Sequence, residues 1–201
     1  NGRLISIKNI KIFSSKVHEE IKVIFLSDMH LGSNPRSHLE KICLKIRDLD
    51  FDLLLIGGDF IDSSAFDLDG LNALNIIKKP ILFVSGNHEY YIKDYQRKLQ
   101  KLNDYDLIVL DNDSFKFRNV NVIGISDNQT LRSQELVANK LTQEKFFNLI
   151  LVHKPTLWGL VLEKTDLMLS GHTHNGQIFP FNLFVKLRFK NIYGLYEELN
   201  S

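Results

Sequence analysis

The chain has 201 residues, 44% hydrophobic and 24% charged, so it can form one folded domain with a substantial core. Lysine and arginine number 25 against 24 aspartate and glutamate residues, a net charge of +1. A protein that holds nucleic acid by its phosphates usually carries a clear basic excess, so this balance argues against a nucleic-acid partner. The single cysteine, Cys43, excludes an intrachain disulfide and a thiolate metal cluster.

The first half of the chain alternates apolar runs with amphipathic stretches. Short apolar runs rich in β-branched residues predict buried strands over 21–26, 53–56 and 81–84. Apolar residues at helical spacing predict helices over 39–49, 68–77 and 91–102. Cys43 falls on the apolar side of the first of these helices, which predicts a small buried core residue. This alternation is typical of an α/β domain.

The second half is richer in predicted strands. Short apolar runs predict strands over 107–110, 114–117, 120–125, 149–152 and 167–169. A helix is predicted over 156–163, whereas the polar stretch 129–143 reads as part helix and part loop. The segment 178–199 is predicted to contain strands and turns.

The sequence predicts no membrane-spanning helix, because it contains no run of 18 apolar residues, and no signal peptide is recognisable. The chain begins with Asn1 rather than Met. We therefore expect a single domain over residues 1–201, and leave open that the chain is a fragment lacking an N-terminal membrane anchor.

Residues suited to metal binding follow five of the predicted strands. They are Asp28 and His30, Asp59, Asn87 and His88, His153, and His172 and His174. Ligand sites in open α/β sheets collect at the carboxyl ends of strands, so these side chains are expected to converge. Five of the seven histidines take part in this pattern, whereas His18 and His38 are interpreted as structural or surface residues.

The spacing and the residue types indicate two metal ions. In an extended chain, residues two apart point the same way, so Asp28 and His30 are expected to face one metal. His172 and His174 are expected to face two neighbouring metals. Imidazole and carboxylate ligands favour Mn, Fe, Zn or Co over Mg or Ca. Two divalent ions leave the site net positive, which favours an anionic substrate such as a phosphate ester.

The same residues carry a family resemblance. The blocks Asp28-x-His30, Gly58-Asp59, Gly86-Asn87-His88-Glu89, His153 and Gly171-His172-x-His174 resemble those of the calcineurin-like metallophosphoesterases, in the same order. The resemblance runs over residues 22–175. It implies an α/β fold, a four-layer α/β/β/α sandwich of two mixed β-sheets flanked by helices, and a metal-dependent hydrolase of phosphoric ester or pyrophosphate bonds.

The resemblance also implies a role for each residue. Asp28, His30 and His174 would bind the first metal, Asn87, His153 and His172 the second, and Asp59 would bridge the two, with manganese the preferred ion. A hydroxide between the metals would attack phosphorus. His88 would be catalytic, stabilising the phosphoryl oxygens or protonating the leaving group. The complete set of positions argues against a non-catalytic, metal-stabilised interaction module.

The branch of the family is indicated by smaller features. The stretch 58–64 lacks the arginine of the family's Ser/Thr phosphatases. Residues 86–91 and 171–178 are similar to the membrane-associated bacterial phosphodiesterase branch, although Asn175 replaces a glycine of that branch. The branch includes the UDP-2,3-diacylglucosamine pyrophosphatases of lipid A biosynthesis, so UMP release from that lipid-linked nucleotide is expected. A phosphodiesterase acting on a soluble nucleotide or another phospholipid is the alternative.

A segment rich in phenylalanine, Phe179–Phe189, is interleaved with basic residues. Aromatic residues beside cations suit peripheral docking on an anionic membrane, which would place the enzyme at the inner, cytoplasmic face of the membrane. A pair of ordinary core strands with solvated lysines explains the pattern equally well. The sequence indicates a phosphorylated small-molecule or lipid-linked nucleotide as substrate, and no protein partner can be inferred from it.

Overall fold

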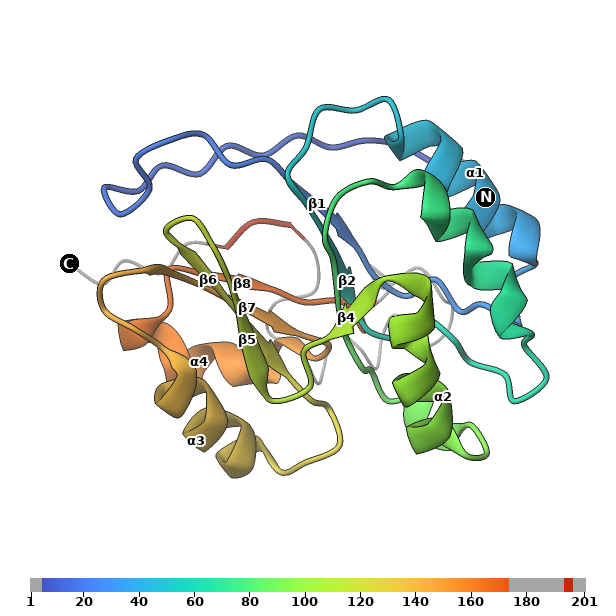
Figure 1. Ribbon diagram of the computed structural model, residues 1–201. Coiled ribbons are helices and arrows are strands. Elements are labelled where there is room, and N and C mark those ends of the chain that lie inside the picture. Colours follow the sequence, from blue (N-terminus) through green and yellow to red (C-terminus); the bar gives the residue numbers. More distant parts are fainter. Residues whose placement is uncertain (1–4, 174–193, 197–201) are drawn as a thin grey trace.

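The computed structural model describes residues 5–173 and 194–196, which form two four-stranded sheets covered by helices on their outer faces (Figure 1). The first sheet contains β1 (Val23–Leu26), β2 (Leu53–Gly57), β3 (Ile81–Val84) and β4 (Leu107–Val109), in that order. The second contains β5 (Asp113–Phe117), β6 (Val120–Ile125), β7 (Phe147–Val152) and β8 (Leu167–Leu169), also in sequence order.

The helices divide between the two sheets. The first sheet is covered by α1 (Arg36–Ile46), a 3₁₀ helix (Leu68–Ile76) and α2 (Tyr95–Leu102). The second is covered by α3 (Leu131–Leu141) and α4 (Trp158–Val161), which lie together on one side of it in Figure 1. Short 3₁₀ turns complete the described part of the chain at Glu89–Tyr91, Asn103–Tyr105, Pro155–Leu157 and Leu162–Lys164.

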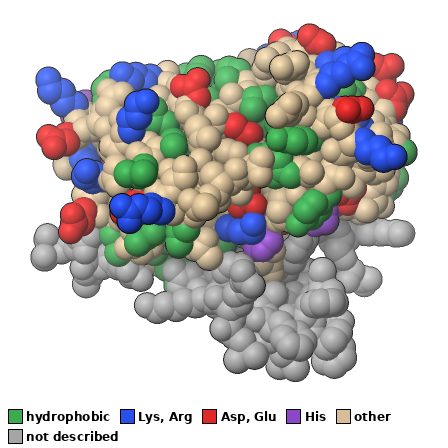
Figure 2. Space-filling model, turned by 90° about the horizontal axis from the view of Figure 1, so that it is seen from below, with side chains coloured by type: hydrophobic (Ala, Val, Ile, Leu, Met, Phe, Trp, Pro, Cys, Tyr) green, Lys and Arg blue, Asp and Glu red, His purple; other side chains and the backbone are tan. Residues whose placement is uncertain are grey.

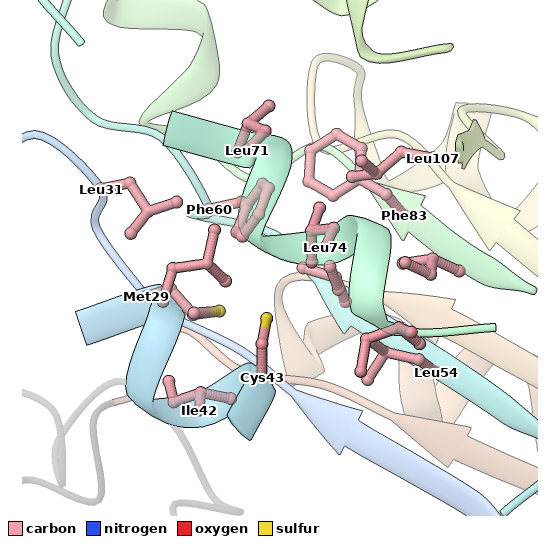
Figure 3. Close-up of a cluster of buried hydrophobic side chains, with 14 of the residues drawn as sticks. Met29, Leu31, Ile42, Cys43, Leu54, Phe60, Leu71, Leu74, Phe83 and Leu107 are labelled. Carbon is pink, nitrogen blue, oxygen red and sulfur yellow. The ribbon is translucent and has the colours of Figure 1, made fainter. Parts of the chain in front are cut away.

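Alternation along the strands explains the layers. In β2, Leu54 and Ile56 pack among the helices of the first sheet, whereas Leu53 and Leu55 pack against the second sheet. Figure 3 shows the helix-side cluster, in which Leu54 lies among side chains from several elements. In β7, Leu149 and Leu151 face the first sheet, whereas Ile150 and Val152 face α3 and α4. The central strands β2 and β7 are therefore buried on both faces.

The predicted four-layer architecture is confirmed. Within the described residues the first sheet is entirely parallel, and only the second is mixed, because β5 runs antiparallel to β6. Cys43 is buried as predicted, and burial raises the pKa of its thiol to about 12.

Three predicted elements differ in detail. The helix predicted over 68–77 is a 3₁₀ helix, because its glycine, asparagine and aspartate residues are poor α-helix formers. The helix predicted over 91–102 begins only at Tyr95, since Asp94 adopts a left-handed backbone with φ 56°. The ambiguous stretch 129–143 contains α3, which begins after Thr130, whose side chain accepts a hydrogen bond from the Ser133 N–H.

Two predictions concern membranes. Among the described residues, no helix is long and apolar enough to cross a bilayer. The segment Phe179–Phe189, predicted as either a membrane contact or core strands, lies outside the described residues.

Candidate metal centre

The carboxyl ends of strands from both sheets meet at one place. Asp28 and His30 follow β1, Asp59 follows β2, and Asn87 and His88 follow β3 in the first sheet. His153 follows β7, and His172 comes shortly after β8 in the second sheet. His174, the remaining predicted ligand, lies outside the described residues. Neither His18 nor His38 belongs to a cluster of metal-ligating side chains in the described part of the chain.

Asp59 lies at the centre of this arrangement. Its Oδ2 atom is 3.1 Å from His153 Nε2, 3.9 Å from His88 Nε2 and 4.0 Å from His30 Nε2. Three groups of side chains in the described part of the chain could each hold a metal ion: Asp28, His30 and Asp59; Asp59, His153 and His172; and His30, Asp62 and His88. The ligand atoms of each group lie within 4.8 Å of one another, and Asp59 belongs to two of the groups.

Asn87 supports the fit of a metal at this place. Its Oδ1 atom is buried and has no hydrogen-bond partner among the described residues. A buried amide oxygen without a partner is costly, so such an atom calls for an explanation. A cation bound beside Asn87 would supply one, because an amide oxygen is a good ligand for a divalent ion. The donor set of carboxylate, imidazole and amide suits a transition metal.

The backbone that presents these ligands is not extended, contrary to the prediction made for Asp28 and His30. Both adopt left-handed conformations, with φ 56° and 47°, and so do Asp59 and His172, with φ 51° and 71°. Such conformations are unfavourable for non-glycine residues and are found at sites where the surroundings enforce them. The two side chains do reach a common group, but sharp turns bring them there instead of strand alternation.

Glycines allow the loops to approach one another at two points. A Cβ atom at Gly86 would clash with the Asp59 carboxylate and backbone, and one at Gly171 would clash with the Ser27 and Asp28 side chains. Because Gly86 has no side chain, the loop after β3 can come close to the Asp59 carboxylate. In the same way, Gly171 lets the loop after β8 come close to the Asp28 carboxylate.

Glu89 fixes the loop that carries Asp59. It is 3% exposed, and its two carboxylate oxygens accept hydrogen bonds from four backbone N–H groups, those of Asp59, Phe60, Ile61 and Gly86, at 2.7–3.0 Å. Burial and the nearby Asp59 carboxylate raise the pKa of Glu89 to about 7, against the opposite effect of these donors. The sequence pattern assigned no role to Glu89. Its place directly after Asn87 and His88 was the feature of the sequence that could have indicated one.

The pKa values of His153, which is buried, and His172, which is half-buried, are shifted in opposite directions. Burial disfavours a charge on His153, but hydrogen bonding to Asp59 outweighs this and raises the pKa of His153 to about 8. Both of its ring nitrogens have acceptors, since Nδ1 lies 2.8 Å from the Gly57 carbonyl oxygen. Burial and the positive charges of His153 and Lys154 lower the pKa of His172 to about 4.

The same pairing acts on Asp59. Burial alone would raise the pKa of its carboxyl, but His153 and the His88 N–H lower it to about 2. Asp59 therefore remains an anion in the absence of metal, because it is paired with the protonated ring of His153. The same ring is a proposed ligand when a metal ion is bound. Loss of the His153 proton would free Nε2 for coordination.

Two further features lie at the rim. Asp62 Oδ2 is 3.3 Å from His30 Nδ1, a geometry that orients the ring so that Nε2 faces Asp59. Sequence reading did not single out Asp62. The side chain of His88 is 40% exposed, and its ring packs edge-on against that of Tyr91. In Figure 2, histidine side chains reach the surface beside a lysine or arginine side chain.

The sequence of the chain matches a known family. The profile described as calcineurin-like phosphoesterase matches residues 21–176. The chain belongs to this family. An uncharacterized metallophosphoesterase of Helicobacter pylori is 35% identical over 96% of this chain and 55% of its own length. A Bacillus subtilis metallophosphoesterase is 32% identical over 82% of this chain and 66% of its own length.

Other relatives are more distant. A Danio rerio protein described as a transmembrane protein with a metallophosphoesterase domain is 30% identical over 88% of this chain and 45% of its own length. A crystal structure of a Thermus thermophilus protein aligns with a TM-score of 0.56 and 14% identity over 75% of this chain and 81% of its own, which supports the fold. The chain spans about half the length of the Helicobacter pylori relative.

Family membership defines the chemistry in general terms. The chain carries the domain of a metal-dependent phosphoester hydrolase, and the family implies divalent metal ions. The residues that the matched region brings together are chemically suited to hold such ions.

Proposed function

We propose that this chain, as a single metallophosphoesterase domain over residues 1–201, hydrolyses phosphodiester or pyrophosphate bonds with two divalent ions. The ligands proposed are Asp28, His30 and His174 for one ion and Asn87, His153 and His172 for the other, with Asp59 shared. The observation that carries the proposal is the convergence of three imidazoles on the Asp59 carboxylate, together with the unpartnered Oδ1 atom of Asn87, the residue before His88. Bound ions would supply Lewis acidity toward the phosphoryl oxygens and toward water.

His88 is the proposed catalytic residue. Its backbone N–H donates to Asp59 Oδ1 at 2.9 Å, so its position is tied to that of the shared carboxylate. Its half-exposed ring is accessible to a bound substrate, unlike the fully buried ring of His153. From this place His88 would donate a hydrogen bond to a phosphoryl oxygen or a proton to the leaving group.

Hydrolysis of bis(p-nitrophenyl) phosphate by the metal-loaded protein tests the proposal. We expect turnover that a chelator abolishes and that added Mn²⁺ restores, because imidazole and carboxylate donors suit manganese. The variant His88→Ala should lose most of the turnover while it keeps its bound metal. A metal-loaded protein that hydrolyses no phosphodiester would show the domain to be a binding module.

For the natural substrate we propose UDP-2,3-diacylglucosamine, cleaved with release of UMP at the cytoplasmic face of the membrane. Support comes from the similarity of residues 86–91 and 171–178 to the branch that includes such pyrophosphatases. The measurement is UMP release in detergent with Mn²⁺, with and without chelator. Turnover of a soluble nucleotide diester without any detergent requirement, and none of the lipid, would favour the soluble-substrate alternative.

A further inference from the structure

A lysine lies directly beside the candidate metal centre. Lys154 follows His153 in the chain, and its Nζ atom is 2.6 Å from Asp127 Oδ2. Asp127 comes just after β6, and Lys154 just after β7, so the ion pair joins the carboxyl ends of two neighbouring strands. The ion pair therefore borders the proposed ligands on the β6 side.

The two partners of this ion pair differ in exposure. The Asp127 side chain is only 3% exposed, whereas 32% of the Lys154 side chain remains accessible. An ammonium group has three donors, and the contact with Asp127 uses one of them. The buried carboxylate thus holds the lysine in one place, and the accessible part of the lysine can meet a ligand.

The position of Lys154 relative to the proposed ligands is set by strand order. His153 and His172 follow β7 and β8, whereas Asp127 draws the Lys154 amine toward the end of β6, on the opposite side of β7 from β8. Neighbouring strands lie about 4.8 Å apart. The lysine is therefore placed to the side of the centre, where it would meet a group next to the phosphate being cleaved.

We propose that Lys154, held by Asp127, binds a second phosphate of the substrate, so that the site prefers pyrophosphate diesters over simple phosphodiesters. This inference rests on the proposed function. A compact, strongly hydrated ammonium is a suitable partner for a phosphate oxygen. In the reaction, water supplies an oxygen to one phosphorus and the bridging P–O bond breaks. The departing phosphate monoester keeps the bridging oxygen and its electron pair, and the protons of water pass to the two products and solvent.

Two matched substrates test the preference. The p-nitrophenyl esters of UMP and of UDP differ by one phosphate group, and hydrolysis of either at the uridine-linked phosphorus yields UMP, which chromatography can quantify. For each substrate, kcat and KM are measured with the metal-loaded wild type and with Lys154→Met. We expect the ratio of kcat/KM for the UDP ester to that for the UMP ester to fall at least tenfold, mainly through KM for the UDP ester. Lys154→Arg should retain most of the ratio.

Three controls keep the result specific. Lys164→Met makes the same substitution at an exposed lysine before β8, at the opposite end of the sheet, and should leave the ratio unchanged. Bound metal per chain should be the same in wild type and Lys154→Met. Asp127→Asn keeps the side-chain shape but releases the lysine, and should lower the ratio about threefold even if Lys154→Met does not fold.

The outcomes separate the two proposals. An unchanged ratio in Lys154→Met and in Asp127→Asn, or an equal loss on both substrates, would overturn the assignment of Lys154. A wild type that cleaves the UMP ester but not the UDP ester would also overturn it, while the proposed phosphoesterase function stands. A wild type that cleaves neither ester nor any other phosphodiester would overturn both.

Discussion

The first sheet brings the carboxylates of Asp28 and Asp59, the Asn87 amide and the imidazoles of His30 and His88 to the candidate metal centre. The second brings the imidazoles of His153 and His172 and the Lys154 amine. The two contributions are also held differently. Asp28 and Asp59 are in left-handed conformations, and Asp59 belongs to a loop held by the buried Glu89 carboxylate. His153 lies directly after a fully buried strand, is itself 0% exposed and bonds the Gly57 carbonyl oxygen across the two sheets.

This difference indicates how substitutions on each side of the centre should act. On the first-sheet side, the Asp59 turn is held by one buried side chain, that of Glu89, so a substitution there should mainly change the conformation of the loop. On the second-sheet side, His172 also has a left-handed backbone, but His153 follows a strand within the core, so a substitution of His153 should act mainly through electrostatics. The following predictions test this division.

The largest effect is expected from Asp59→Asn, which removes the charge shared by both sides. We expect kcat/KM for a phosphodiester to fall at least about a thousandfold, equivalent to about 4 kcal/mol of barrier. The measurement is chelator-sensitive turnover at saturating Mn²⁺, with metal content determined in parallel. Since asparagine has nearly the same shape, the far-ultraviolet circular dichroism should not change. Retention of a tenth of the activity would refute a central role for this carboxylate.

The next effect isolates the first-sheet side. Glu89→Ala leaves four buried N–H groups without their acceptor, so we expect the metal-free protein to lose about 3 kcal/mol of unfolding free energy in urea. Glu40→Gln, in α1, where the side chain is 46% exposed, serves as the control and should change stability by less than about 0.5 kcal/mol. Equal losses in the two variants would mean that Glu89 does not fix the Asp59 loop.

A pH titration isolates the second-sheet side. The pKa of His153 is raised from 6.5 to about 8, so its proton stabilises the metal-free fold fully below pH 6.5, and this stabilisation is lost as the pH rises through 8. The shift of about 1.5 units corresponds to about 2 kcal/mol. Glu89, with its pKa raised to about 7, changes stability in the same direction up to that pH.

The measurement is urea unfolding of the chelated protein between pH 6.5 and 8. His153→Gln should flatten the profile above pH 7, where Glu89 no longer contributes. A wild-type stability that rises over this interval would contradict the assignment of the proton to the ring between Asp59 and Gly57.

The smallest predicted effect concerns the rim of the first-sheet side. Asp62→Asn removes the carboxylate beside His30 Nδ1, so we expect metal affinity to fall about tenfold while the fold is retained. Competition with a fluorescent chelator measures this change. Asp69→Asn, an exposed position in the 3₁₀ helix, is the matched control. An equal affinity in both variants would show that Asp62 does not orient the ring.

The general architecture follows from local patterns in the sequence. The short apolar runs predict β3 and β6 with the same bounds as in the structure, because strands buried on both faces are apolar along most of their length. The polar residues that follow the predicted strands led us to expect that Asp59 and His153 lie close together, and in the structure their side chains are 3.1 Å apart. Sequence periodicity could not predict the helix type over 68–76, where poor α-helix formers lie at helical spacing.

The turns of the site were not predictable in the same way. A left-handed aspartate depends on tertiary contacts, such as the donation by the Asp59 N–H to Glu89, which lies 30 residues further along the chain. The contact between Asp62 and His30 also depends on how two loops meet, as does the ion pair of Lys154 with Asp127. These features arise from the folded chain rather than from the spacing of residues within one segment.

The hydrogen bond between His153 and the Gly57 carbonyl oxygen has a consequence for cooperativity. It joins the two halves of the sandwich at the very residue proposed to bind metal, and the His172 N–H adds a second link to the Asp28 carboxylate. Metal binding should therefore couple local unfolding of the first sheet to local unfolding of the second. Amide exchange in β2 and β7 would then slow in parallel as metal is titrated in, so that the two sheets behave as a single folding unit.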